Sequence, residues 1–309
     1  MSTFQTSGPI AAVLELRVGD ITVAACDRDD CTVSIRPRSM DRPADVAAAG
    51  DVKVDFINGT LTITSVKPWQ RVIGPSKGDG ALDVEVNLPT GSSLKATTGM
   101  GLVHSEGELT DTIARTGIGD IRLDRVGALN AKSGLGDVTV GRVDSEAKVA
   151  TTSGSLRLGV LAGSATVKNA NGAVEIDECR RFTHVRAANG DITIGRALSS
   201  MTAVSAAGDI RIDEVSAGSV TARAGAGAID IGIREGTAAW LELSARYGTV
   251  RNDLTSTSGP ESSESTVEVR ARCAGGDVTV HRAVTRSGRH LQVRQVGGPT
   301  AAPPATVTS

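Results

Sequence analysis

Aromatic residues are scarce in this chain of 309 residues, which contains three Phe, two Trp and one Tyr. A core without large rings must be filled by Val, Ile, Leu and Ala, which suits thin layers better than a thick globular interior. An excess of charge of one sign is lacking too, since 33 Lys and Arg stand against 35 Asp and Glu, with the signs interspersed. Such a balance provides no field that would recruit nucleic acid or an anionic membrane non-specifically.

Targeting and membrane-spanning segments are not visible either. The first ten residues have neither a basic start nor an apolar run of signal-peptide length. No stretch approaches the roughly twenty apolar residues of a membrane span. We therefore expect a soluble, cytoplasmic protein. The four cysteines are expected to be reduced thiols rather than a disulfide framework.

A repeat is the strongest feature that the sequence does contain. A glycine followed by two aliphatic residues at alternate positions recurs every 17 to 19 residues, as in Gly119 with Ile121 and Leu123. Period-two alternation is typical of a strand with one buried face. The clearest copies follow Gly119, Gly136, Gly154, Gly172, Gly190, Gly208 and Gly227.

A second alternating stretch precedes each glycine, so each repeat carries about two short strands and two turns. One such strand pair cannot bury its apolar face alone, whereas stacked copies join their faces into one continuous column. The sequence therefore predicts an all-β fold, a single right-handed parallel β-solenoid with rungs of about 18 residues. Glycine suits the tight corner between the strands, and the aspartate that often follows it suits a turn.

The ends of the chain are less regular. We expect a flexible N-terminus over residues 1–10, a solenoid over 11–284 and a disordered tail over 285–309. Within the solenoid, 11–90 would form irregular opening rungs that cap one end, with loops at 36–49 and 66–80. Regular rungs are expected over 91–254, a loop insertion over 255–265, and the last rung over 266–284.

The repeat resembles a known family. The Gly-Asp-(Ile/Val)-x-(Ile/Val) units, with the segments 167–172, 187–192 and 232–241, are similar to bacterial β-strand repeats grouped as putative adhesins, domain of unknown function 4097. The likeness runs from about residue 11 to residue 284. It implies a β-helical fold with stacked glycine units, and it transfers no catalytic residues.

Candidate metal sites are weak. Stacked rungs would bring the corner aspartates close together, and close carboxylates could hold Ca²⁺. The ladder is broken by residues such as Ser155 and Ala173 at the matching positions, so structuring of the turn is the favoured interpretation and no cofactor is expected. The weak metal candidates are Asp120, Asp137, Asp191 and Asp209.

The cysteines and histidines were also considered as sites. Cys26 and Cys31 could form half a zinc site, but a surface turn between two strands is favoured because no second pair has suitable spacing. Cys179 and Cys273 occupy core slots of the repeat. No nucleophile elbow, phosphate loop or dinucleotide fingerprint is found, although a Ser-His-Asp arrangement can form only in space. The histidines are His104, His184, His281 and His290.

The outward positions of the glycine strands alternate in charge, which is neither a threonine ladder nor a basic stripe. They are Arg122, Thr139, Arg157, Glu175, Thr193, Arg211, Asp230, Arg251 and Thr279. Two hypotheses for function follow. The first is a non-enzymatic scaffold or interaction protein that binds an unknown protein partner or further copies of itself, without nucleic acid. The second, by analogy of fold alone, is a carbohydrate-binding or carbohydrate-active β-helix.

Overall fold

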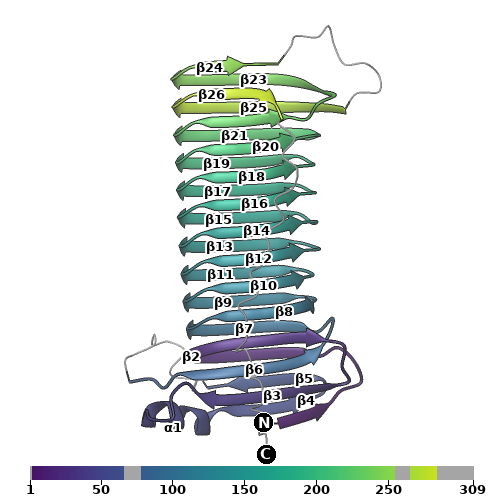
Figure 1. Ribbon diagram of the computed structural model, residues 1–309, viewed down its shortest axis with the longest axis vertical. Coiled ribbons are helices and arrows are strands. Elements are labelled where there is room, and N and C mark those ends of the chain that lie inside the picture. The colour runs from purple at the N-terminus through teal and green to yellow at the C-terminus, as the bar shows by residue number, and fades with distance from the viewer. Residues whose placement is uncertain (1, 66–77, 255–264, 284–309) are drawn as a thin grey trace, which may run out of the picture.

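The computed structural model describes residues 2–65, 78–254 and 265–283. The chain winds into a column of stacked rungs, and each regular rung contributes one strand to each of two parallel sheets (Figure 1). We call these sheet A, which contains the strands that follow the corner glycines, and sheet B, which contains the strands that precede them. The predicted all-β parallel solenoid is therefore confirmed.

Both sheets share the long strand β2 (Ala11–Cys26), whose first half lies in sheet B and whose second half lies in sheet A. The other parallel strands of sheet B are β5 (Thr60–Thr64), β7 (Ser93–Met100), β9 (Thr112–Ile118), β11 (Leu129–Leu135), β13 (Ala147–Ser153), β15 (Ala165–Asn171), β17 (Thr183–Asn189), β19 (Met201–Ala207), β21 (Gly218–Ala226), β23 (Thr237–Tyr247) and β25 (Ser265–Gly275). Those of sheet A are β6 (Leu82–Pro89), β8 (Val103–Leu109), β10 (Ile121–Val126), β12 (Val138–Val143), β14 (Leu156–Leu161), β16 (Val174–Cys179), β18 (Ile192–Ala197), β20 (Ile210–Val215), β22 (Ile229–Ile233), β24 (Val250–Asn252) and β26 (Val278–Arg282).

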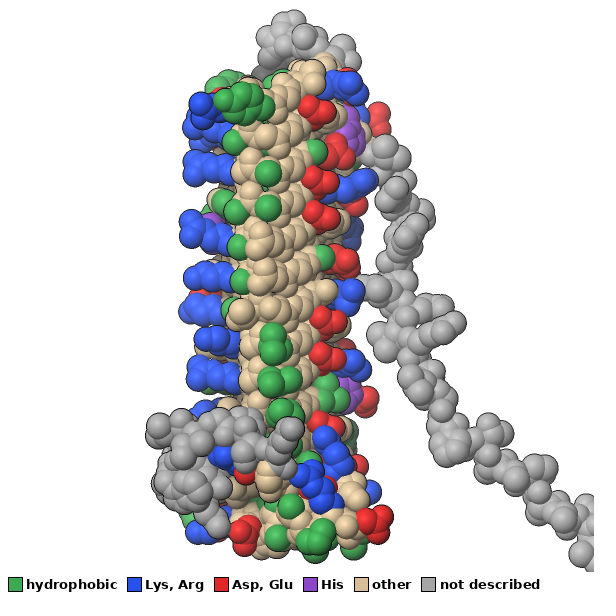
Figure 2. All heavy atoms as spheres, turned by 90° about the vertical axis from the view of Figure 1, so that its left-hand side faces the viewer, with side chains coloured by type: hydrophobic (Ala, Val, Ile, Leu, Met, Phe, Trp, Pro, Cys, Tyr) green, Lys and Arg blue, Asp and Glu red, His purple; other side chains and the backbone are tan. Residues whose placement is uncertain are grey.

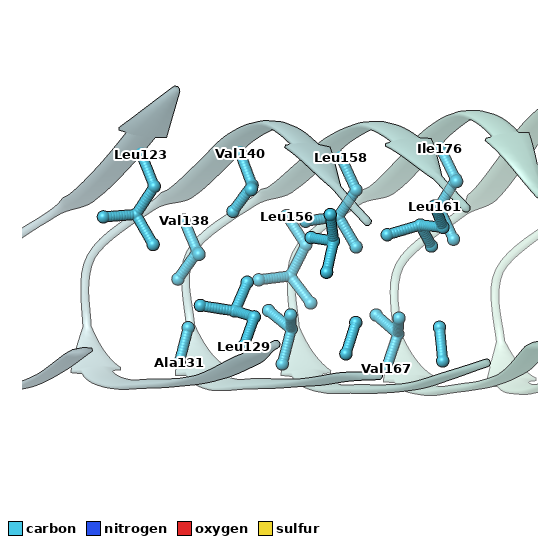
Figure 3. Close-up of a cluster of buried hydrophobic side chains, with 14 of the residues drawn as sticks. Leu123, Leu129, Ala131, Val138, Val140, Leu156, Leu158, Leu161, Val167 and Ile176 are labelled. Atoms are coloured by element: carbon cyan, nitrogen blue, oxygen red, sulfur yellow. The ribbon is translucent and has the colours of Figure 1, made fainter. Parts of the chain in front are cut away.

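Alternate residues of each strand point into the narrow space between the sheets. Figure 3 shows Leu158 and Ile176 of sheet A facing side chains of sheet B such as Val167. All three side chains are buried. Rung stacks on rung in register, so Leu158 lies beside Val140 on one side and Ile176 on the other. The aliphatic pattern thus builds one continuous dry core, as the sequence predicts.

The corner glycines are required by close approach between rungs. Gly190 has φ of +137°, and a Cβ built on it would lie 2.2 Å from the carbonyl oxygen of Gly172 in the neighbouring rung. Only glycine tolerates both the positive φ and this contact. The same geometry recurs along the column, and it accounts for the glycine of the repeat.

At the N-terminal end, antiparallel strands close the column. β3 (Asp30–Pro37) pairs with β6, and β4 (Lys53–Ile57) pairs with β5. Two expectations are wrong here. Residues 1–10, expected to be flexible, contain β1 (Ser2–Gln5), which pairs with β3, and the expected loop 36–49 contains the helix α1 (Pro43–Asp51). Pro43 at the helix start and the short alanine run favour a helix, which no period of two would reveal.

The rungs at both ends do not follow chain order. β2 lies between β5 and β7 in sheet B and between β6 and β8 in sheet A. At the other end, β25 lies between β21 and β23, and β26 lies between β22 and β24. The expected last rung, 266–284, is therefore the last in sequence but not in space, because the rung of β23 and β24 lies beyond it (Figure 1).

Parts of three expectations fall outside the described residues. These are the loop 66–80 at residues 66–77, the insertion 255–265 at residues 255–264, and the tail 285–309.

Candidate functional site

The four candidate metal-binding aspartates are used by the fold itself. Asp120 Oδ1 accepts a hydrogen bond from the backbone N–H of Asp137 at 3.0 Å, and Asp137 Oδ1 accepts one from Ser155 at 2.7 Å. Asp191 and Asp209 accept equivalent bonds from the next rung. Each carboxylate thus ties its own corner to the following one. Across residues 2–65, 78–254 and 265–283, no three His, Cys, Asp or Glu side chains gather as a metal site.

The cysteines also sit in structural positions. Residues 27–29 join β2 to β3, so Cys26 and Cys31 flank a turn between two strands, as favoured above. Cys31 is buried, and burial raises the pKa of its thiol to about 11. Cys179 is in register with Leu161 in the core, and burial raises its pKa to about 11 as well. Such thiols are protonated and unreactive at neutral pH.

The histidines do not complete a catalytic triad in the described part of the chain. Both ring nitrogens of His281 are engaged, with Nε2 3.1 Å from Asp230 Oδ1 and Nδ1 2.7 Å from the carbonyl oxygen of Arg282. A general base needs one free ring nitrogen to accept the proton of a nucleophile. His104 pairs with Glu106 on the surface, and His290 lies outside the described residues.

The outer face of sheet A neutralises its own charges. Arg122 lies 3.0 Å from Asp120, and Arg211 lies 2.6 Å from Asp213. Asp144 receives hydrogen bonds from Arg125 and Arg142, which together hold the pKa of its carboxyl below the usual range. The register along this face matches the alternating residues expected from the sequence. Sheet A therefore presents compensated charge to solvent.

The outer face of sheet B is different. One register position carries cations in six of eight consecutive rungs, and no acid occupies it. The eight residues are Arg115, Lys132, Ala150, Lys168, Arg186, Val204, Arg223 and Arg272. Arg272 pairs with Glu242 at the end of the molecule. The other five cations are exposed, and none has an ion pair with a described residue. We call Arg115, Lys132, Lys168, Arg186 and Arg223 the basic column.

The basic column is visible as a file of Lys and Arg side chains along one side of the rod, separated by the corner from a file of Asp and Glu (Figure 2). Adjacent rungs are about 4.8 Å apart, so unit charges held near that spacing repel each other by roughly 1 kcal/mol in water. His184 reports this field. Burial first, and then the charges of Arg186 and Lys168, lower the pKa of its imidazole.

Sequence reasoning missed this face. The charges alternate along the chain, but the winding sorts them, because each cation of the basic column recurs one rung later at the same outward position. The outward positions of the strands before each glycine contain the signal, yet only those after the glycine had been compared. The expectation that no local positive field exists does not describe the folded surface.

A shallow depression lies at the opposite corner of the rod. Its volume is about 430 Å³, and it is lined by Arg196, Leu198, Glu214, Arg234, Glu235 and Ala283. Arg234 lies 3.8 Å from Glu214, so the lining compensates much of its own charge. The lining holds no Ser, Cys or His that could act as a nucleophile or base.

No helix in the described ranges is both long and apolar enough to cross a membrane. The expected cytoplasmic location stays a prediction. A search of curated proteins finds no match.

Comparison with solved structures finds proteins of similar extent. A putative adhesin from Bacteroides fragilis is 13% identical, with a TM-score of 0.35, and the match covers 90% of this chain and 95% of that one. A putative adhesin from Parabacteroides distasonis is 16% identical with the same coverage and TM-score. A putative lipid binding protein from the same species is 12% identical, with a TM-score of 0.34 and again 90% and 95% coverage.

The family comparison covers more than half of the chain. The model described as Toastrack DUF4097 matches residues 13–288, which begins in β2 and extends past β26. This range includes both sheets and every corner glycine from Gly19 to Gly276. The chain therefore belongs to the Toastrack DUF4097 family.

Proposed function

We propose that this protein is a non-enzymatic scaffold, a rigid rod that acts by presenting the outer face of sheet B to a binding partner. The observation that carries the proposal is the contrast between the two faces. Arginines of sheet A are paired with carboxylates of the same face, whereas the basic column has no ion pair in the described part of the chain. Mutual repulsion along the column costs stability, which an anionic partner would offset.

The rod is suited to presentation rather than turnover. Its core is filled by aliphatic side chains in register from rung to rung, which fixes the spacing of the outward residues. Catalysis usually requires convergent polar groups in a concave, water-excluding site. The described depression beside Glu214 is open and its charges are compensated.

The test compares two variants with equal loss of charge. The first removes Lys132, Lys168 and Arg186 of the basic column by substitution with Gln. The matched control replaces Arg122, Arg157 and Arg211 of sheet A with Gln. Binding is measured to polyglutamate, polyphosphate, a sulfated glycan and anionic vesicles. We expect at least one probe to lose about tenfold or more in affinity with the first variant and less than about threefold with the control.

Two results would contradict the proposal. One is equal binding by both variants, or no binding to any probe. The other is turnover in a panel of polysaccharide lyase and hydrolase substrates that is abolished by a single carboxylate change such as Glu214→Gln, which would favour the carbohydrate-active alternative.

A further inference from the structure

The basic column is a single file rather than a patch. Its residues share one register position, and six rung-to-rung steps separate Arg115 from Arg223. At about 4.8 Å per step the column is roughly 29 Å long and one residue wide. Two neutral positions, Ala150 and Val204, interrupt it. The pattern from one end is therefore two cations, a gap, two cations, a gap, and a cation.

Small and neutral residues flank the column on the side of the glycine corner. They are Gly117, Gly134, Thr152, Ala170, Ala188, Ala206 and Gly225, each two positions after its column residue. No bulky side chain on this side would keep a ligand from lying alongside the cations.

The flank on the other side of the column is polar. Thr166 and Thr202 lie in register with His184 between them. Hydroxyl and imidazole groups donate hydrogen bonds to phosphate oxygens. An anionic chain lying along the column would therefore meet charge and hydrogen-bond donors together.

The same face offers no ring on which a nucleic-acid base could stack. From β9 to β21, the outward positions of sheet B contain no Phe, Tyr or Trp. Proteins that bind single-stranded nucleic acids generally combine a basic track with aromatic platforms. The surface is therefore suited to recognise repeated anionic groups and not the bases attached to them.

Resting on the scaffold function proposed above, we propose that the basic column binds an unbranched chain of phosphate groups laid along the axis of the rod. A linear chain matches a single file, because each phosphate can meet one rung. A membrane surface would favour cations spread over both outward positions of each strand. The exposed apolar residues Met100, Ile118 and Leu135 lie on the neighbouring corner, so anionic vesicles are included as the competing outcome.

The first experiment measures binding of inorganic polyphosphate as a function of chain length and salt. Affinity should rise with length until the chain spans about 29 Å and then level off when counted per phosphate. With five phosphate contacts, the slope of log K against log salt should be near −3.5, or about a 100-fold loss between 50 and 200 mM. Free phosphate should not compete at equal phosphate concentration.

The second experiment removes and adds cations on the full chain. The Lys132→Gln, Lys168→Gln, Arg186→Gln variant should lose at least about 30-fold in affinity at 50 mM salt. Filling the gaps with Ala150→Lys and Val204→Lys should instead raise affinity at least tenfold. The matched control, Thr139→Lys and Thr193→Lys, adds the same charge to sheet A and should change affinity less than threefold. Circular dichroism checks that each variant is folded.

A site-specific readout comes from His184. Polyphosphate bound on the column should raise the pKa of its imidazole in an NMR titration, because nearby anions favour the protonated ring. The gain-of-charge control on sheet A should leave this response unchanged.

The outcomes separate the two proposals. Length-independent binding, equal effects of the column and sheet A variants, or an unchanged His184 would overturn the phosphate-chain proposal. If only polyglutamate or only anionic vesicles bind, and the column variant abolishes that binding, the scaffold function stands and the phosphate-chain proposal is wrong. If no probe distinguishes the faces, both fail.

Discussion

Each corner of the rod is held by two kinds of hydrogen bond besides the strand ladders. The aspartate after the glycine accepts from the next rung, as Asp137 does from the N–H of Ser155. A small polar residue before the glycine donates to the previous one, as Thr151 Oγ1 does to the carbonyl oxygen of Gly136 at 3.2 Å. Both bonds satisfy backbone groups that the bend removes from the sheets. This explains buried Thr and Ser in an otherwise aliphatic core.

Substitution of a corner glycine should be strongly destabilising. In Gly190→Ala, the new Cβ would meet the carbonyl oxygen of Gly172 at 2.2 Å, in a backbone with φ of +137°. We expect a loss of about 3 kcal/mol or more in the free energy of unfolding, measured by urea denaturation. Gly50→Ala in α1 is the control, since a Cβ there meets nothing within 4 Å and should change stability by less than about 1 kcal/mol. Equal effects would contradict the argument.

Thiol reactivity should follow burial. Cys26 is exposed, whereas Cys31, Cys179 and Cys273 are buried. With thiol pKa values of about 11 for Cys31 and Cys179, only about one molecule in a thousand ionises either group at pH 8. We expect one fast thiol per native chain in a disulfide-exchange assay and four after denaturation. Cys26→Ser should remove the fast phase, and a second fast thiol would show that a buried slot opens.

At the scale of elements, the unit of this protein is a pair of strands and not a single strand. β14 and β15 contact mainly β12 and β16, and β13 and β17, so each rung depends on its two neighbours. In such quasi-one-dimensional arrays, stability is close to a sum of rung and interface contributions. A rung can therefore be removed if the register is kept.

Deletion of one rung tests this directly. Removing residues 157–174 takes out 18 residues and joins Leu156 to Glu175, so Ile176 still points inward. The variant should fold cooperatively, with a rod about 5 Å shorter by small-angle scattering. Removing 157–173 takes out 17 residues and turns Ile176 outward, which should prevent folding of the following rungs. Folding of both variants, or of neither, would contradict a register-controlled column.

At the scale of the whole molecule, the two ends differ. The N-terminal end is closed by β3, β4 and α1, whereas the opposite end finishes in β23 and β24. In that outermost rung, Leu241 and Leu243 are only half-buried and Trp240 is exposed. Val267 and Val269 of β25, although later in the chain, are buried beneath it.

Hydrogen exchange should follow spatial order and not chain order. Amides of β23 are expected to exchange fastest among the sheet B strands at this end, because this rung has a neighbour on one side only. Amides of β25 should be protected like those of β21, since β25 is paired on both sides. Mass spectrometry of peptic fragments measures this order. Faster exchange in β25 than in β23 would show that the last segment of the chain is the outer rung in solution.

The repeat itself determined the regular part of this protein. The two-residue alternation after each glycine places Ile192 and Ile194 inward, and the constant spacing of about 18 residues predicts the stacked rungs. The slot of Cys179 and the outward residues of the glycine strands follow from the same periodicity. These features are local, or recur at one fixed separation, so a sequence pattern is enough to reveal them.

Only the tertiary structure decided the order of rungs at the two ends, the antiparallel closure by β3 and β4, and the basic column. Pairing of β2 with four strands, or insertion of β25 between β21 and β23, depends on long-range contacts that leave no periodic trace in the chain. The column arises because charges spread evenly along the sequence are sorted by the winding onto one face. Net charge is a property of composition, whereas the field that a partner meets is a property of the fold.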